Sequence, residues 1–283
     1  MKVLDLFSGI GGFSLGLERA GMKTVAFCEN DRWCQAVLKK HWPDTTIHND
    51  VKKMKYKDGK LACFGSNGST LHTVDIDLIC GGFPCQDISV GGLQKGIIDG
   101  DRSSIWKHYW RLIREIRPKY AIIENVERLR KNGLGIVLND LSEIGYNAEW
   151  HCITARAIGL PHQRDRVWII AHRSGERPHE YIGEKRHIQI NEKRQSEEIY
   201  TERKQRQFKP GEVCTILSRG AIDSARDANA HLFSALPGVR RVVDGVPSGL
   251  DEDLRKERIK MLGNSIVPQI AELIGRAIME HEV

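Results

Sequence analysis

The first 30 residues predict a strand, a glycine-rich turn, a helix and a second strand in immediate succession. Residues 2–7 have the apolar character of a buried strand, residues 8–12 (Ser-Gly-Ile-Gly-Gly) form the turn, and residues 13–20 have helical character. The second strand, over residues 24–28, ends at Glu29. This arrangement is typical of nucleotide-binding α/β folds, in which the glycines let the backbone approach a ligand and the acid binds two ribose hydroxyls.

The spacing of the glycines narrows the kind of ligand. Gly9 and Gly11 match the first two glycines of the dinucleotide-binding pattern, but the third falls at Gly12 or Gly16 and not at position 14. We therefore expect a mononucleoside-type ligand without phosphates, and not the pyrophosphate of a dehydrogenase cofactor.

Strands continue to alternate with helices over the first 170 residues, which predicts an α/β fold with a doubly wound, mostly parallel sheet. Residues 52–73 are polar and are expected to form a surface excursion. The further strands are expected at residues 76–80, 120–123, 148–155 and 166–171, and the helices at residues 31–40, 103–116 and 133–144.

The character of the chain changes after residue 173. Residues 174–209 are dense in Lys, Arg, Glu and Gln and show almost no apolar periodicity, and up to about residue 253 only short, weak elements are expected. This stretch fits either a solvated, partly disordered linker or a variable recognition module built of loops, and the interleaved charges do not decide between these. A capped helix from Ile266 to about Met279 is expected to return the chain to regular structure.

Two reactive side chains follow predicted strands. Cys85 comes after two glycines and Pro84, which stiffens the backbone and fixes where the thiol points. Such a cysteine is placed as a nucleophile would be, although most free cysteines are small buried hydrophobes. Glu124 directly follows a buried strand and is either a satisfied structural acid or a partner of Cys85, because ligands bind at the carboxyl ends of strands in such sheets.

Other polar residues near the predicted strand ends have two readings each. Arg164 and Arg166 either reach the same sheet edge or form a surface salt-bridge lattice with Asp165. Asp50 either contacts an amino group of a ligand or caps a turn. His162 is a lone loop histidine and is not expected to be a ligand.

Composition excludes several classes of protein. The seven cysteines are scattered and form no C-x-x-C pair, so neither a metal site nor a disulfide framework is expected. No leader of signal-peptide type and no membrane-spanning segment is found, which predicts a reducing, cytosolic setting. The net charge of +6 permits a polyanionic partner without demanding one.

Taken together, these motifs resemble the DNA (cytosine-5)-methyltransferases, in the family's order and across nearly everything except residues 174–258. Residues 5–13 resemble the adenosylmethionine-binding motif and residues 263–268 the C-terminal motif that closes the cofactor pocket. Residues 82–86 are similar to the catalytic Pro-Cys loop, residues 124–126 to the Glu-Asn-Val motif and residues 163–166 to the arginine motif.

The resemblance implies a role for each matching residue. It implies methyl transfer from S-adenosylmethionine to carbon 5 of a flipped-out cytosine in double-stranded DNA, through a covalent bond between Cys85 and carbon 6. The implied catalytic residues are Cys85, Glu124, Arg164 and Arg166; the implied cofactor residues are Phe7, Gly9, Gly11, Gly12, Glu29, Asp50, Pro84, Asn264 and Ser265; and the implied DNA contacts are Gln86, Ser89 and Arg102.

The resemblance also implies an organisation and a setting. Residues 1–173 would form the catalytic and cofactor-binding domain, residues 174–258 the target-recognition region, and residues 259–283 a segment returning to the catalytic domain. A monomer in the cytoplasm of a prokaryote, or a viral protein in its host, is expected, with a restriction endonuclease as a functional partner left open.

The chain departs from the family pattern at two places, and alternatives remain. Ile88 stands where phenylalanine is more common, and His162 where glutamine is common, but neither position has a direct chemical role. An RNA cytosine methyltransferase of the same architecture and a non-catalytic DNA-binding homologue stay open. A nicotinamide oxidoreductase is disfavoured by the glycine spacing.

Overall fold

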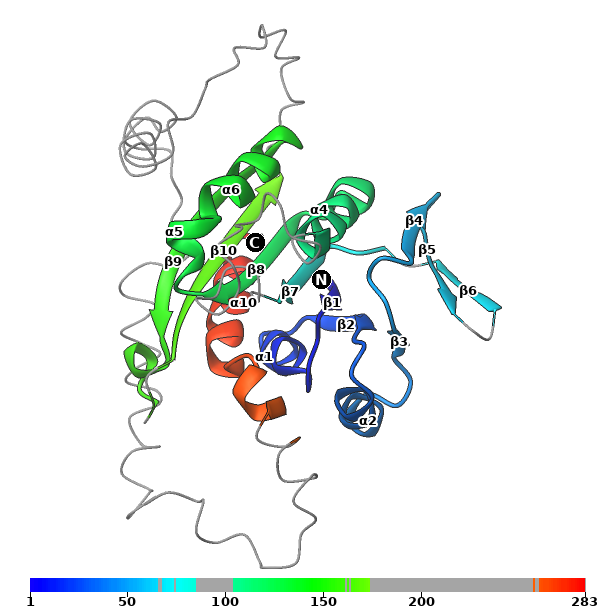
Figure 1. Ribbon diagram of the computed structural model, residues 1–283, viewed down its shortest axis with the longest axis horizontal. Helices are drawn as coiled ribbons and strands as arrows, with labels where there is room; N and C mark the ends of the chain where they lie inside the picture. Colours follow the sequence, from blue (N-terminus) through cyan, green and yellow to red (C-terminus); the bar gives the residue numbers. More distant parts are fainter. Residues whose placement is uncertain are drawn as a thin grey trace, which may run out of the picture.

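A seven-stranded sheet forms the centre of the molecule, with the strand order β3-β2-β1-β7-β8-β10-β9 (Figure 1). The computed structural model describes residues 1–65, 68–73, 75–84, 104–160, 162, 164–173, 257 and 260–282. The strands are β1 (Lys2–Leu6), β2 (Lys23–Cys28), β3 (Thr46–His48), β7 (Leu78–Gly82), β8 (Tyr120–Val126), β9 (Tyr146–Thr154) and β10 (Asp165–Arg173). Within this sheet β10 runs antiparallel to both of its neighbours, and the other neighbouring pairs are parallel. The expected doubly wound, mostly parallel sheet is confirmed.

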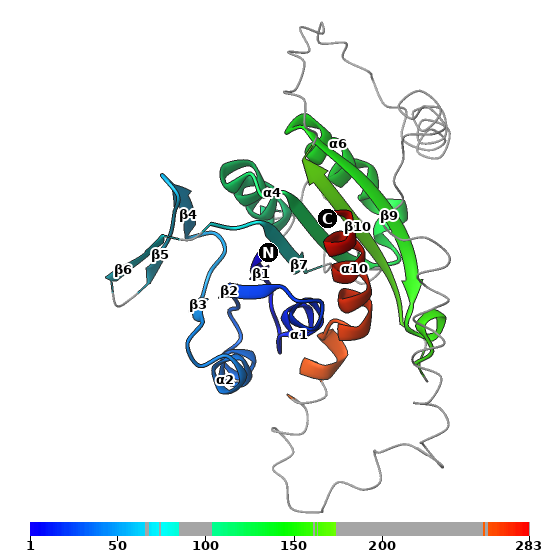
Figure 2. The same ribbon diagram turned by 180° about the vertical axis from the view of Figure 1, so that it is seen from behind.

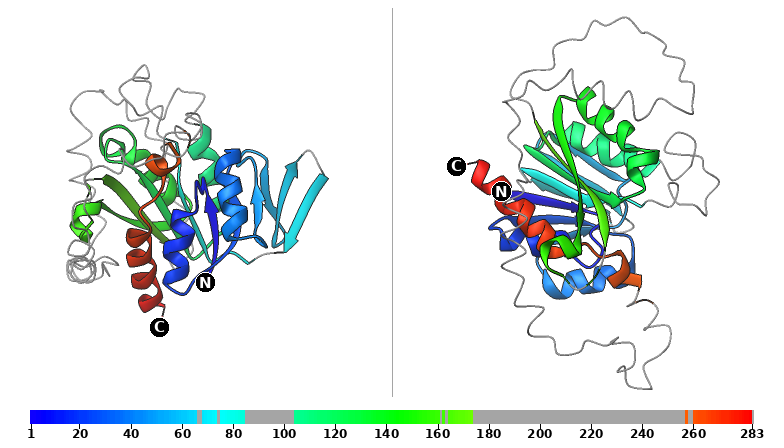
Figure 3. Two further views of the ribbon diagram at one scale, coloured as in Figure 1. Left: turned by 90° about the horizontal axis from the view of Figure 1, so that it is seen from below. Right: turned by 90° about the vertical axis from the view of Figure 1, so that its left-hand side faces the viewer.

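Helices cover both faces of the sheet, so the molecule has three layers (Figure 3). One apolar cluster joins one face of the sheet to α4, α5 and α6, and a second joins the other face to α1, η1 and α10. The helices are α1 (Gly12–Arg19), α2 (Arg32–His41), α4 (Ser104–Ile116), α5 (Leu129–Asn132), α6 (Leu134–Glu143), the short 3-10 helix η1 (Ala155–Ile158) and α10 (Pro268–His281). None of the helices in the described part of the chain is long and apolar enough to cross a membrane.

The termini of two helices show how local sequence sets these elements. Asp31 caps α2, because its side chain accepts hydrogen bonds from the backbone N–H groups of Trp33 (2.8 Å) and Cys34 (3.3 Å). The helix expected from Ile266 begins instead at Pro268, and no side chain in the described part of the chain caps it. Proline is favoured at the first helical position because its missing N–H would have no partner there.

The surface excursion expected at residues 52–73 contains a three-stranded antiparallel sheet that the sequence analysis did not predict, and its first strand packs beside α4 (Figure 1). Its strands are β4 (Met54–Lys57), β5 (Lys60–Gly65) and β6 (Gly68–Thr73). Asp58 and Gly59 connect the first two strands with φ of 52° and 73°. An Asp-Gly pair with both φ positive is the preferred two-residue hairpin turn, so the signal was present in the sequence.

Helices α1 and α10 lie side by side on one face of the sheet (Figure 2). Gly16 of α1 permits their close approach, since a Cβ at this position would lie 2.2 Å from the carbonyl oxygen of Pro268. In α10, Ile270, Ile274 and Ile278 recur every four residues and are buried against the sheet. Burial of each such side chain contributes about 1.5–3 kcal/mol.

The contact between α1 and α10 predicts the effect of adding one methyl group. Gly16→Ala should lower the free energy of unfolding by about 1–3 kcal/mol, because backbone atoms of α10 must move away. Gly135→Ala in α6 is the matched control, since a Cβ there meets nothing within 4 Å. The control should gain roughly 0.5–1 kcal/mol from helix propensity. Urea unfolding of both variants measures the difference, and equal stabilities would contradict the packing described.

Candidate active site

The carboxyl ends of four parallel strands meet at one edge of the sheet. Strand β1 pairs with β2 on one side and with β7 on the other, and β7 pairs with β8. The chain order reverses between β1 and β7, and ligands of open α/β sheets bind outside the carboxyl ends at such a point. Because β10 is antiparallel, its first residues lie at this same edge.

The glycine turn after β1 has an unusual backbone. Phe7, Gly9 and Gly11 have φ of 54°, 54° and 86°, a region that L side chains rarely adopt. A Cβ on Gly11 would lie 2.5 Å from the ring of Trp42, and a Cβ on Gly12 would lie 2.7 Å from a backbone oxygen of Ile266.

A Cβ on Gly9 would meet no atom of the described residues within 4 Å. Gly9 therefore borders open space. At Gly11 and Gly12, by contrast, the absence of a side chain lets Trp42 and Ile266 pack closely against the turn.

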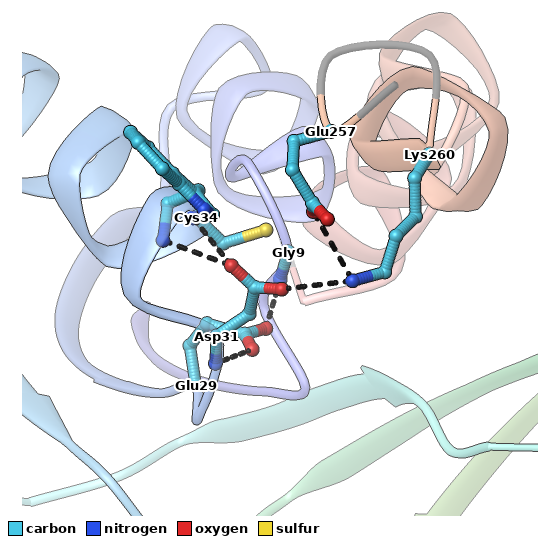
Figure 4. A network of polar contacts seen from close by, with 7 residues as sticks. Gly9, Glu29, Asp31, Cys34, Glu257 and Lys260 are labelled. Carbon is cyan, nitrogen blue, oxygen red and sulfur yellow. Dashed lines mark hydrogen bonds and ion pairs between the residues drawn. The ribbon is translucent and has the colours of Figure 1, made fainter. Parts of the chain in front are cut away.

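Glu29 lies beside this open space and is 8% exposed. Its Oε2 accepts a hydrogen bond from the N–H of Gly9 (2.7 Å), and its Oε1 accepts one from the N–H of Asp31 (2.8 Å; Figure 4). Each carboxylate oxygen has two acceptor sites, so each can still accept a hydroxyl group from a ligand. The carboxylate and the open space at Gly9 leave room for the ribose that the sequence analysis expects here, and that role stays a prediction.

The other residues expected at the cofactor site differ in what they do. The Oδ1 of Asp50 accepts a hydrogen bond from the N–H of Lys52 (2.9 Å), which is the turn-capping alternative. The hydroxyl of Ser265 donates to the carbonyl oxygen of Ile266 (3.1 Å). Pro84 and Asn264 are exposed. The pair at Glu29 and Gly9 is therefore the best-defined part of this site.

Glu124 and Arg166 form an ion pair at the same edge. The two residues lie on one face of the antiparallel β8–β10 ladder, two register positions apart, where long side chains can meet diagonally. The Nε of Arg166 lies 2.9 Å from Oε1 of Glu124, which is 7% exposed. Burial raises the pKa of the Glu124 carboxyl to about 7, although the positive charges of Arg166 and Arg164 oppose the increase.

Gly82 makes room for this carboxylate. It stands opposite Glu124 in the β7–β8 register, and a Cβ on Gly82 would lie 2.7 Å from Oε2 of Glu124. The same Cβ would lie 3.6 Å from Cδ1 of Ile266. The absence of a side chain at Gly82 therefore leaves space for the Glu124 carboxylate, next to the residues that lead to Pro84.

The two arginines have different partners. Whereas Arg166 binds Glu124, Arg164 donates from a terminal guanidinium nitrogen to the carbonyl oxygen of Gly263 (2.6 Å). Burial and the neighbouring charge of Arg166 lower the pKa of the Arg164 guanidinium, and Glu124 opposes this. The Nε of Arg164 is buried and has no hydrogen-bond partner among the described residues.

Asn125 belongs to the Glu-Asn-Val motif, but the sequence analysis assigned it no role of its own. It is 2% exposed, and its Nδ2 donates to the carbonyl oxygen of Phe83 (3.1 Å). Its Oδ1 accepts from the N–H of Val126 (2.9 Å). Asn125 thus holds the backbone just before Pro84. An asparagine next to a strand-end acid was the available signal.

Four predicted residues lie outside the described part of the chain. These are Cys85, Gln86, Ser89 and Arg102. The described residues on either side are Pro84 at the carboxyl edge and Ser104 at the start of α4.

Comparison with known proteins relates the chain to a family of methylases. The family model described as C-5 cytosine-specific DNA methylase matches residues 1–222. The type II methyltransferase M2.BsuMI of Bacillus subtilis is 37% identical over 179 residues, which cover 60% of this chain and 42% of that protein. The type II methyltransferase M.HhaI of Haemophilus parahaemolyticus is 30% identical over 178 residues, with coverage of 62% and 50%.

The matches thus span half or less of the length of these curated relatives. Among solved structures, the Dnmt2 methyltransferase of S. pombe superposes with a TM-score of 0.58 and covers 100% of both chains. At 18% sequence identity, that likeness shows the fold alone.

The burial of Glu124 predicts how stability depends on pH. The folded carboxyl titrates near pH 7 and the unfolded one near its ordinary value of 4.5. The folded state therefore binds the proton more tightly, so this contribution is complete below about pH 4.5 and is lost as the pH rises to about 7.

Between pH 5 and pH 8, the wild type should lose roughly 1–3 kcal/mol of unfolding free energy relative to Glu124→Gln. Urea unfolding of both proteins at the two pH values measures the change. The constant loss caused by leaving Arg166 without its carboxylate cancels in this comparison. A stability difference that does not change with pH would contradict the raised pKa.

Proposed function

The chain belongs to the C-5 cytosine-specific DNA methylases, and on this basis we propose that it methylates carbon 5 of a flipped-out cytosine in a specific DNA sequence. The observation that carries the proposal is the ion pair between Glu124 and Arg166 at the carboxyl edge of the sheet. Cys85 follows Pro84 directly in the chain, shortly after the end of β7, and β7 pairs with the strand that carries Glu124.

The proposed reaction begins with the Cys85 thiolate, which forms a covalent bond to carbon 6 of the cytosine. Glu124 with a pKa near 7 can hold a proton at neutral pH and donate it to ring N3 as the ring gains electrons. Arg166 stabilises the negative charge that develops on the O2 side of the ring.

Carbon 5 then takes the methyl group that S-adenosylmethionine supplies when bound. Loss of the carbon 5 proton to water or a general base expels the Cys85 thiolate, and the N3 proton returns to Glu124, which restores the neutral aromatic ring. The cofactor residues proposed are those implied by the resemblance, with the Glu29 carboxylate and the open space at Gly9 as the best supported.

The substrate proposed is double-stranded DNA. A base stacked in a duplex cannot reach the Glu124 carboxylate, so it must be flipped out of the helix. We propose that residues 86–102 close over that base, with Gln86, Ser89 and Arg102 contacting DNA, and that residues 174–258 read the target sequence. By the same resemblance the protein would act as a monomer in the cytoplasm, and a cognate restriction endonuclease as a functional partner stays open.

Covalent trapping tests the reaction. A duplex that carries 5-fluorocytosine should form an adduct that resists denaturant, because fluorine at carbon 5 cannot leave as a proton does. Cys85→Ala should form no adduct and transfer no methyl group, while its cofactor affinity stays near that of the wild type. Cys152→Ala is the matched control, since Cys152 is an exposed cysteine on β9, and it should form the adduct normally.

Two outcomes would overturn the proposed reaction. Methyl transfer by Cys85→Ala would exclude the covalent step. If the protein forms an adduct with fluorinated RNA and forms none with any fluorinated duplex DNA, the assignment moves to an RNA methyltransferase.

Cofactor affinity tests the role of Glu29. Glu29→Gln should weaken S-adenosylmethionine binding roughly tenfold or more, since the charge is lost and the amide N–H₂ faces backbone N–H donors. Glu143→Gln on the exposed face of α6 should bind normally. Isothermal titration calorimetry without DNA measures both, and an unchanged affinity in Glu29→Gln would remove Glu29 from the site.

A further inference from the structure

The segment from Lys260 to Ile266 lies against several parts of the candidate site at once. A backbone oxygen of Ile266 approaches the glycine turn so closely that a Cβ on Gly12 would lie 2.7 Å from it. The Ile266 side chain also borders Gly82, the glycine beside Glu124. A displacement of this segment would therefore disturb both the proposed cofactor side and the proposed base side.

Lys260 ties the segment to the cofactor side. Its Nζ lies 3.3 Å from Oδ2 of Asp31 and 3.2 Å from Oε2 of Glu257 (Figure 4). Asp31 is also the residue whose N–H donates to the Glu29 carboxylate. The lysine charge thus acts one hydrogen bond away from the carboxylate that fits a ribose. This ion pair is partly exposed, so its contribution is small and sensitive to salt.

Arg164 ties the segment to the base side. Its hydrogen bond to the Gly263 carbonyl oxygen, at 2.6 Å, joins the start of β10 to the residue just before Asn264. A hydrogen bond from a charged donor is stronger than a neutral one, and this donor is half-buried. Since Arg166 already binds Glu124, the two arginines divide between the acid and the C-terminal segment.

We propose that Arg164 and Lys260 are positioning residues for the cofactor: each fastens one end of residues 260–263, and together they hold the following residues against the glycine turn. The inference deepens the proposed function, on which it rests, and changes the role that the family resemblance implies for Arg164. In that role Arg164 contacts the cytosine, and its unpartnered Nε would be the donor. The two roles differ in one measurable respect, because a contact to the base cannot affect cofactor binding in the absence of DNA.

Cofactor affinity without DNA is therefore the test. Arg164→Met should weaken S-adenosylmethionine binding roughly tenfold by calorimetry, as expected for loss of a charge-assisted hydrogen bond. Arg164→Lys keeps the charge and a donor, and it should recover most of the affinity. Thermal unfolding of each protein without ligand identifies any general loss of structure. If Arg164→Met does not fold, Arg164→Lys decides the test. It should bind S-adenosylmethionine a few-fold more weakly than the wild type, and an unchanged affinity would overturn the positioning role.

Lys260 has its own matched set. Lys260→Met should weaken binding about threefold at low salt, and the effect should vanish near 1 M salt. Asp31→Asn keeps a capping side chain on α2 while removing the charge, so it should weaken binding to the same degree. The double variant should be no worse than either single variant. Arg276→Met removes an exposed ion pair within α10 and should bind normally.

The outcomes separate this inference from the proposed function. Arg164→Met that binds the cofactor as the wild type does without DNA, but loses turnover, would overturn the positioning role and restore the base contact. Equal loss in Arg276→Met would overturn it as well. The expected losses of cofactor affinity in the Arg164 and Lys260 variants would support the inference even if the wild type forms no adduct with fluorinated DNA. That second result would overturn the proposed reaction alone.

Discussion

A carboxylate buried at the end of a strand is costly unless a charge or hydrogen bonds compensate it, and Glu124 meets this constraint through Arg166. The pairing requires that β10 run against its neighbours, so that its beginning lies where β8 ends. It also requires that Gly82 carry no side chain, because the carboxylate occupies that space. The sheet topology and one glycine thus hold Glu124 beside Arg166, and burial lets Glu124 keep a proton near neutral pH.

The C-terminal segment packs against the strand ends that carry the site. Ile266 packs between the glycine turn and Gly82, and Asn125 holds the backbone that leads to Pro84. These contacts come from four places that are distant in sequence, which is why only a folded chain can assemble the site. The proposed chemistry uses the charged side chains of Glu124 and Arg166, and the surrounding contacts fix where these side chains lie.

How far the sequence alone leads depends on the range of the interaction. The glycine turn, Glu29 and the strand ends were predictable because each rests on a local pattern, and the Asp58-Gly59 hairpin could have been read in the same way. The direction of β10 could not be read, since an apolar run looks the same in either direction. The partners of Arg164 and Lys260 were also hidden, because each hydrogen bond or ion pair joins residues far apart in the chain.

The reversed direction of β10 has a consequence for the length of chain that must join residues 173 and 257. The strand ends at Arg173, beside Tyr146 and Lys119, which is the sheet edge opposite the site. The described chain reappears at Glu257 and Lys260, at the edge that carries the site. With nine residues, β10 is about 30 Å long. Any segment that joins these two points must therefore span about 30 Å along the strand direction. In extended conformation this takes roughly nine residues.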